Sequence, residues 1–150
     1  MRAVIQRVTS ASVTIDGERV SGIGCGLVVL LGVEETDDAG DIEWLTGKVA
    51  GLRLFPDAAG AWGRSVAETD GRVLVVSQFT LFASTKKGTK PSWHRAAKPE
   101  VAQPLCDAFL DRLGTLLPGR VCAGRFGAMM SVALENDGPV TLWIDSRQRE

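Results

Sequence analysis

The sequence is poor in the residues that mark metal-binding and disulfide-linked proteins. It has one histidine, His94, and three widely spaced cysteines, Cys25, Cys106 and Cys122. No CxxC pair and no metal-ligand spacing occurs, so we expect no bound metal, no cofactor and no disulfide framework. We interpret all three cysteines as small buried hydrophobic residues, since a cysteine nucleophile would also need a histidine partner.

Long hydrophobic runs are also missing. The longest is Leu27 to Leu31, which suits a buried strand, whereas a membrane helix needs about 20 apolar residues. The opening MRAVIQRVTS has no signal-peptide pattern, and we expect a cytoplasmic protein without membrane contact. A chain of 150 residues, 45% hydrophobic and 23% charged, predicts one globular domain over residues 1–150.

Familiar catalytic and nucleotide-binding motifs are absent too. There is no GxxxxGK[ST] loop and no GxGxxG after a strand, because the glycines of IGCGLVVLL precede their strand. His94 lies in a basic loop and is better explained as a solvated residue than as a catalytic base. Any activity must therefore use hydroxyl groups, backbone amides or the substrate itself.

Charge is balanced overall, at −1, but it is unevenly distributed. Six acids fall within residues 34–43. Three of them, Asp37, Asp38 and Asp41, suit the positive end of a helix capped by Thr36 or Asp37. Residues 86–98 contain five bases and no acid: Lys86, Lys87, Lys90, Arg95 and Lys98. This segment is either a solvated basic loop or a local contact for phosphate.

Hydrophobic periodicity predicts two helices within a largely β chain. Ile42, Leu45, Val49 and Leu52 recur at helical spacing, and a second helix is expected over residues 99–117, kinked or delayed by Pro104. Asp16-Gly17 predicts a hairpin turn. Strands are expected over 2–8, 11–15, 18–21, 27–33, 52–55, 62–66, 72–83, 121–123, 129–134 and 140–145.

Two local features could carry chemistry. Ser77-Gln78-Phe79-Thr80 places polar residues in an apolar strand, either as a satisfied core hydrogen-bond network or as groups that bind an oxyanion or substrate. Asn136-Asp137-Gly138-Pro139 is favoured as a plain turn between two strands, and the alternative is a rigid backbone device with a cis Gly138-Pro139 bond.

The two features occur together in one family. SQFTLFA, then KKGTKPSW, then GRFGAMMSVALENDGPVTLWIDS, with the opening MRAVIQRVTSASVTIDGE and GLVVLLGV, resemble the D-aminoacyl-tRNA deacylases along essentially the whole chain. The chain departs from the family pattern at AWGRSV (residues 61–66), Thr89 and Trp93, which concern loop contacts.

The resemblance implies an α/β single domain of three layers, β/β/α, with mixed and mostly antiparallel sheets, two helices and a homodimeric assembly. It implies hydrolysis of the ester between a D-amino acid and the terminal adenosine of tRNA, and glycyl-tRNA as a further substrate. Ser77, Gln78, Phe79 and Thr80 would line each pocket as catalytic residues. Substrate binding would involve Gly138, Pro139, Phe126 and Met129, with Arg7 in support.

The same resemblance suggests how D- and L-aminoacyl groups are distinguished. Gly138-Pro139 of the other subunit would grip the α-amino group, so that an L side chain clashes with this dipeptide. Backbone N–H groups near Phe79 and Thr80 would stabilise the oxyanion, and the tRNA 2′-hydroxyl would assist. Thr80 either lines the pocket or acts as the nucleophile. Lys86, Lys87 and Lys90 become candidate tRNA contacts.

Two other functions fit parts of the sequence. A non-catalytic RNA-binding homodimer would use the basic segment with Trp93, although a single aromatic residue is a poor stacking platform. A purely structural homodimer would use Gly138-Pro139 as an interface turn.

Overall fold

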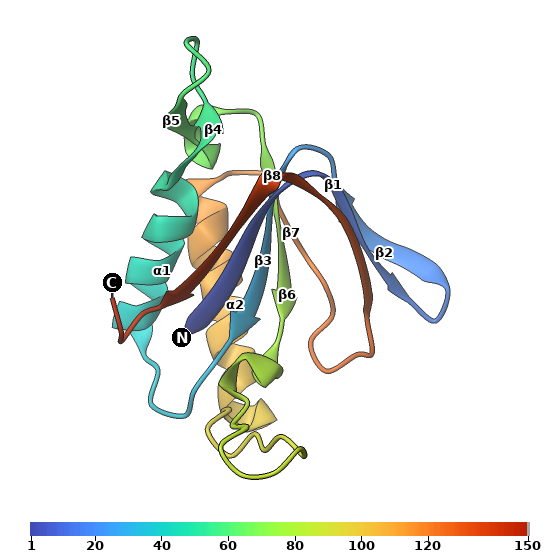
Figure 1. Cartoon of the computed structure of the whole chain (residues 1–150). Helices are drawn as coiled ribbons and strands as arrows, with labels where there is room; N and C mark the ends of the chain where they lie inside the picture. The colour runs from blue at the N-terminus through green and yellow to red at the C-terminus, as the bar shows by residue number, and fades with distance from the viewer. Residues whose placement is uncertain (150) are drawn as a thin grey trace.

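A strongly bent six-stranded sheet forms the body of the protein, and two helices cover one of its faces (Figure 1). This computed structural model describes residues 1–149. The elements are β1 (Arg2–Ile15), β2 (Glu18–Ile23), β3 (Gly26–Gly32), α1 (Ala39–Gly51), β4 (Arg53–Pro56), β5 (Trp62–Ser65), η1 (Val66–Glu68), β6 (Arg72–Ser77), η2 (Phe79–Phe82), α2 (Pro99–Leu116), β7 (Val121–Ala123) and β8 (Ser131–Asp145).

Strand β1 organises the sheet. Antiparallel β8 pairs along one edge of β1, while β3 and then β2 share the other edge. β6 continues the sheet parallel to β3, and β7 parallel to β6. The β1–β2 turn has positive φ at both Asp16 and Gly17, as a two-residue hairpin requires. β4 and β5 form a separate hairpin that projects from the end of the molecule (Figure 1).

Two hydrophobic clusters give the domain three layers. The first joins the helices to one sheet face, where Leu45 of α1 and Phe109 of α2 meet Ile5 and Val29. The second lies on the other face, where the outer half of β1, including Val13, packs over Val28, Leu74 and Val76. The bent strands therefore fold the sheet onto itself, and the predicted α/β domain with two helices and mixed sheets is confirmed.

Three strand predictions need correction. β1 is one strand, not two, because its pairing with β8 continues past residue 8. β6 ends at Ser77, and the apolar residues 79–82 form the 3₁₀ turn η2 instead of extending the strand. β8 is also continuous, so Asn136-Asp137-Gly138-Pro139 is not a turn between two strands.

The helices also differ in detail from the expectation. Asp38, not Thr36 or Asp37, caps α1, accepting from the backbone N–H groups of Gly40 and Asp41. Asp37 instead accepts from the amine of Met1 at 2.5 Å. Helix α2 runs through Pro104 and is not delayed by it. Among residues 1–149, neither helix combines the length and apolar character needed to cross a bilayer.

Candidate active site

The site begins where β6 stops. Gln78 leaves the strand, and its backbone N–H donates to the carbonyl of Leu31 at 2.7 Å. Its side-chain amide donates to the Thr80 hydroxyl. Gly32 allows η2 to approach the sheet, since an added Cβ would lie 3.1 Å from the Gln78 carbonyl oxygen. Part of this polar segment therefore has its hydrogen-bond partners within the protein, as expected for a core hydrogen-bond network.

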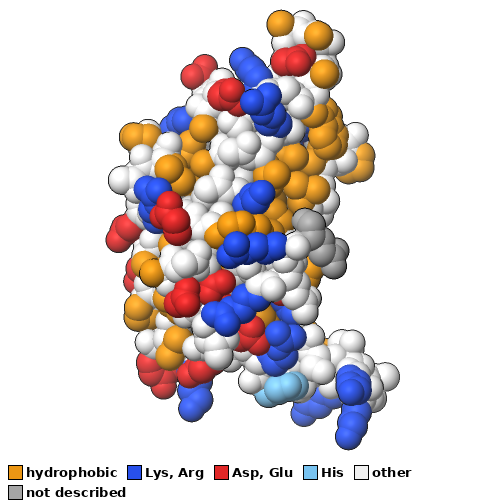
Figure 2. Space-filling model, turned by 90° about the vertical axis from the view of Figure 1, so that its left-hand side faces the viewer, with side chains coloured by type: hydrophobic (Ala, Val, Ile, Leu, Met, Phe, Trp, Pro, Cys, Tyr) orange, Lys and Arg blue, Asp and Glu red, His pale blue; other side chains and the backbone are white. Residues whose placement is uncertain are grey.

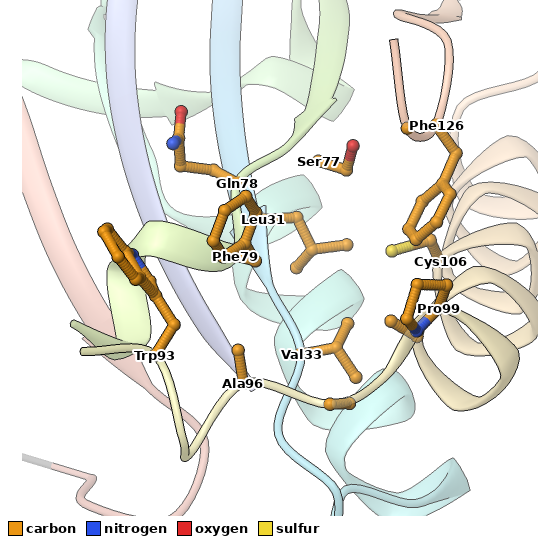
Figure 3. A pocket seen from close by; sticks show the side chains of 13 residues that line it. Leu31, Val33, Ser77, Gln78, Phe79, Trp93, Ala96, Pro99, Cys106 and Phe126 are labelled. Atoms are coloured by element: carbon orange, nitrogen blue, oxygen red, sulfur yellow. The ribbon is translucent and has the colours of Figure 1, made fainter.

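The other part of the segment opens into a pocket. Ser77, Gln78 and Phe79 line a cavity of about 370 Å³ between η2 and the start of α2 (Figure 3). Phe79 meets Trp93 edge-to-face, with ring centroids 5.9 Å apart. The remaining lining residues are mostly apolar: Leu31, Val33, Ala96, Ala97, Pro99, Ala102, Cys106, Phe126 and Gly127. The pocket thus has one polar edge and an otherwise apolar wall.

Cys106 contributes a thiol, a potential nucleophile, to the pocket wall. Burial, with a smaller contribution from Asp107, raises the pKa of its thiol to about 12. Because only a thiolate is strongly nucleophilic, Cys106 acts at neutral pH as an apolar wall. Of the other cysteines, Cys122 is half-buried, whereas Cys25 is exposed, contrary to the expectation that all three are buried.

Several predicted residues lie outside this pocket. The Thr80 hydroxyl is beside it, bonded to Gln78, but Thr80 is not part of the lining. Met129 is 90% exposed. Gly138 and Pro139 are exposed on β8 and do not line the pocket of their own chain. Phe126 is the predicted substrate-binding residue that does line it.

Gly138-Pro139 forms a bulge within β8, and its peptide bond is cis. Gln6 pairs with Thr141 and Val8 with Asn136, so the single residue Arg7 faces residues 137–140. The Asn136 side chain stabilises the bulge with two hydrogen bonds. Its carbonyl oxygen accepts the Val140 backbone N–H at 2.8 Å, and its NH₂ group donates to the Thr141 hydroxyl at 2.9 Å. The dipeptide is therefore a fixed projection.

Arg7 of β1 lies opposite the bulge and binds it through Asp137. Its Nε donates to the Asp137 carbonyl at 3.3 Å and lies 3.0 Å from the Asp137 carboxylate. Its Nη1 donates to the Leu54 carbonyl of β4. Trp62 of β5, in the segment that departs from the family pattern, lies with its ring centre 5.9 Å from the guanidinium carbon. Arg7 is buried and links β1, β4 and the bulge.

The basic segment forms a loop at the end of the molecule near η2. Lys86, Lys87 and Lys90 are exposed, and Figure 2 shows basic side chains and the histidine at this end. Of the five bases, Arg95 is engaged with Glu34 at 2.8 Å. His94 is exposed and contacts the Ser92 hydroxyl at 3.2 Å, so it is a loop histidine outside the pocket.

Sequence reasoning missed most of the pocket wall. Trp93, Pro99 and Cys106 come from a loop and from the first turns of α2, and nothing in their spacing marks them as neighbours of Ser77. Asn136 and Thr141 flank Gly138-Pro139 in the sequence, and this flanking position is the one signal that could have identified them as its braces. No group of three His, Cys, Asp or Glu side chains able to hold a metal occurs within residues 1–149.

Comparison with known proteins decides the family. Residues 4–145 match the profile of the family described as D-Tyr-tRNA(Tyr) deacylase. The chain belongs to this family. Similar relatives named D-aminoacyl-tRNA deacylase occur in Opitutus terrae (59% identity), Akkermansia muciniphila (55%) and Dechloromonas aromatica (54%), each over 100% of both chains. Family membership makes this deacylase homologue a hydrolase that acts on ester bonds.

Two solved structures share the fold of this chain. A protein titled c-Myc DNA Unwinding Element Binding Protein superposes with a TM-score of 0.92 at 44% identity, covering 97% of this chain and 98% of that one. A probable eukaryotic D-amino acid tRNA deacylase gives a TM-score of 0.82 at 18% identity over 95% and 97% of the two chains. The second likeness supports the fold.

Proposed function

We propose that the protein hydrolyses the ester between a D-amino acid, or glycine, and the terminal adenosine of tRNA. The observation that carries the proposal is the pocket at the end of β6, where the polar Ser77-Gln78 edge meets an apolar cavity. Aminoacyl-tRNA esters are made and used in the cytoplasm, which is where we place the enzyme.

The pocket suits the terminal adenosine. Its apolar wall, with Phe79 and Phe126 on it, is chemically matched to a nucleobase, because aromatic side chains stack on any base. The ester would then lie at the polar edge. The backbone N–H groups of Phe79 and Thr80 begin η2, and the first amides of a helical turn have no partner within it. We assign them to the oxyanion.

Thr80 has a lesser role in this proposal. Its hydroxyl already accepts a hydrogen bond from the Gln78 side chain, which fixes both groups at the pocket edge. No histidine lines the pocket, since the chain's one histidine lies outside it. We therefore assign Thr80 to positioning and leave activation of water to the tRNA 2′-hydroxyl.

Chiral selection is assigned to Gly138-Pro139 of a second copy. Within one chain, η2 contacts Gly32, which pairs with Arg2, whereas the bulge faces Arg7. Positions 2 and 7 of an extended strand lie ~17 Å apart and on opposite faces. One chain thus keeps the two motifs separate, and a two-fold partner can bring the exposed bulge to the other chain's pocket.

Exposed apolar side chains support this homodimer. Met129, Phe79 and Trp143 are 90%, 57% and 52% exposed. A partner that covers these side chains would remove their apolar surface from water. In the dimer we expect Met129 to contact substrate or the partner.

The basic loop would contact the phosphates of the acceptor end. Residues 84–98 form a loop at the same end of the molecule as η2 (Figure 1), and Figure 2 shows basic side chains at this end. Lys86, Lys87 and Lys90 of this loop are exposed. Phosphate contacts supply affinity without sequence preference, so this loop would bind tRNAs of different sequence alike.

The deciding experiment compares D- and L-tyrosyl-tRNA with the purified protein in the presence of a chelator. We expect rapid loss of the D ester and loss of the L ester at the buffer rate. Loss of neither ester would reject the enzyme and favour the RNA-binding homodimer, which tRNA binding would then test. Equal loss of both would reject chiral selection alone.

A further inference from the structure

Arg2, the first residue of β1, reaches the active-site turn from the sheet. Its Nη1 donates to the Leu81 carbonyl at 2.9 Å, and its Nε donates to the Asp145 carboxylate at 2.9 Å. Its guanidinium carbon lies 4.5 Å from the centre of the Phe82 ring and 5.5 Å from that of Trp143. The side chain, 13% exposed, therefore connects β1, η2 and β8.

The acid partner of Arg2 is itself fixed. Asp145 has a side chain 7% exposed, and its second oxygen accepts the Arg147 backbone N–H at 2.9 Å. A guanidinium is planar and presents donors in a fixed fork, so a carboxylate bound on one side sets where the other donors point. Asp145 thus aims the Nη1 of Arg2 at the Leu81 carbonyl.

The Leu81 carbonyl lies in the last turn of η2. Carbonyl groups at a helical end have no hydrogen-bond donor within the helix. Arg2 supplies the donor for the Leu81 carbonyl. Phe82, the next residue, is 1% exposed and anchors the turn beneath the sheet face. Because η2 spans four residues, a displacement of Leu81 also displaces the amides of Phe79 and Thr80.

We propose that Arg2 is a positioning residue for the reaction, which holds η2 so that its first amides face the substrate oxyanion. The catalytic part of this inference rests on the proposed function. No pattern in the sequence indicates this role, since Arg2 is a single polar residue at the start of a strand.

The kinetic test uses Arg2→Ala and Arg2→Lys with D-tyrosyl-tRNA. We expect kcat to fall about tenfold to a hundredfold for Arg2→Ala, with KM within about twofold, because a misplaced catalytic group affects the transition state more than binding. Guanidinium ion at low millimolar concentration should restore part of kcat, and ammonium ion should not. Arg2→Lys, which keeps the charge but loses the fork, should resemble Arg2→Ala.

Arg112→Ala is the matched control, because it removes an arginine–carboxylate pair, with Glu43, that joins the two helices and does not touch η2. Its kcat should match that of the wild type. A kcat for Arg2→Ala no lower than that of Arg112→Ala, or a loss explained by the unfolded fraction measured by circular dichroism, would overturn the proposal.

Hydrogen exchange tests the contact without relying on activity. The backbone N–H groups of Leu81 and Ala83 donate to the backbone carbonyls of Gln78 and Thr80, and these two bonds close the turn η2. We expect both to exchange at least about tenfold faster in Arg2→Ala and to be unchanged in Arg112→Ala. Unchanged exchange in Arg2→Ala would refute the positioning role. If the wild-type protein hydrolyses neither ester, the proposed function fails while the exchange result still reports on Arg2.

Discussion

Two arginines on one strand hold two separate features, the turn η2 and the Gly138-Pro139 bulge, in different ways. Arg2 binds a turn carbonyl and a buried carboxylate among aromatic rings. Arg7 binds carbonyls of two elements, and its acid partner, Asp137, has a side chain 46% exposed. Both supply donors to carbonyls outside regular pairing, but Arg2 binds the turn η2 and Arg7 binds the bulge. We therefore expect substitutions of Arg2 to change mainly the rate of ester hydrolysis, and substitutions of Arg7 to change mainly the selectivity between D and L esters.

The largest effect on chirality is expected for Gly138→Ala. Gly138 has φ +134, and an added Cβ would lie 2.7 Å from Val140 Cγ2 and 2.9 Å from the Val140 nitrogen. Forcing a side chain there costs about 1–3 kcal/mol and displaces the bulge. We expect the ratio of D- to L-tyrosyl-tRNA hydrolysis to fall at least about tenfold.

Gly119→Ala is the control for this change. Gly119 also has a positive φ, +69, but no atom lies within 4 Å of an added Cβ. It should share the backbone strain and keep the selectivity. Undiminished selectivity in folded Gly138→Ala would argue against the bulge as the chiral selector.

Arg7→Lys should sharpen the contrast with Arg2→Lys. A lysine cannot reach both the Asp137 and Leu54 carbonyls, and a lost buried hydrogen bond costs about 1–3 kcal/mol. We expect selectivity to fall several-fold while the rate on the D ester changes less, measured as kcat/KM for both esters. If Arg7→Lys lowers the D rate as much as Arg2→Lys does, the two roles are not separate.

Lowering the pH should destabilise the protein by protonating Asp145, the acid partner of Arg2. Burial alone would raise the pKa of Asp145, but hydrogen bonds from Arg2 and from the Arg147 backbone outweigh it, and the pKa lies below the ordinary 3.8. Because this pKa is lower in the folded than in the unfolded protein, the charged carboxylate stabilises the fold when the pH is above the unfolded-state pKa. This stabilisation is lost as the pH falls through the folded-state pKa. Urea midpoints measured from about pH 6 to 2 should fall less steeply for Asp145→Asn than for the wild type. Parallel curves would contradict this.

The smallest effect is expected from the basic loop. Replacing Lys86, Lys87 and Lys90 with Ala should raise KM, leave kcat unchanged and lower the salt slope of binding by about 0.7–0.9 per lost phosphate contact. Lys48→Ala, on α1, is the control. An unchanged slope would remove the loop from the tRNA contact.

Local patterns predicted the helices and most strands because apolar periodicity reports directly on which face is buried. They failed where a pattern has two meanings. Residues 79–82 are as apolar as the strand before them, yet they turn beneath Gly32. Gly138-Pro139 resembles a turn, yet the pairing of β1 with β8 carries the strand through it.

The site was predictable only in part. The polar residues in an apolar strand drew attention to the segment from Ser77 to Thr80, and Ser77, Gln78 and Phe79 of this segment line the pocket. Trp93, Cys106 and Arg2 could not be predicted as their neighbours, because they are brought there by tertiary packing of distant segments. Whether Gly138-Pro139 enters a partner's pocket remains a prediction for the dimer to test.

The placement of β1 and β8 in the chain also bears on folding. Arg7 and Asp137 are 130 residues apart, and Arg2 and Asp145 are 143 apart. Contacts of such long range form slowly and late. During synthesis, Arg2 and Arg7 can meet the carbonyls of Leu81 and Leu54 before β8 is made. Neither arginine has its acid partner until then, so the bulge and the contact with Asp145 form last. The proposed chiral selection should therefore appear only once β8 has been made and has paired with β1.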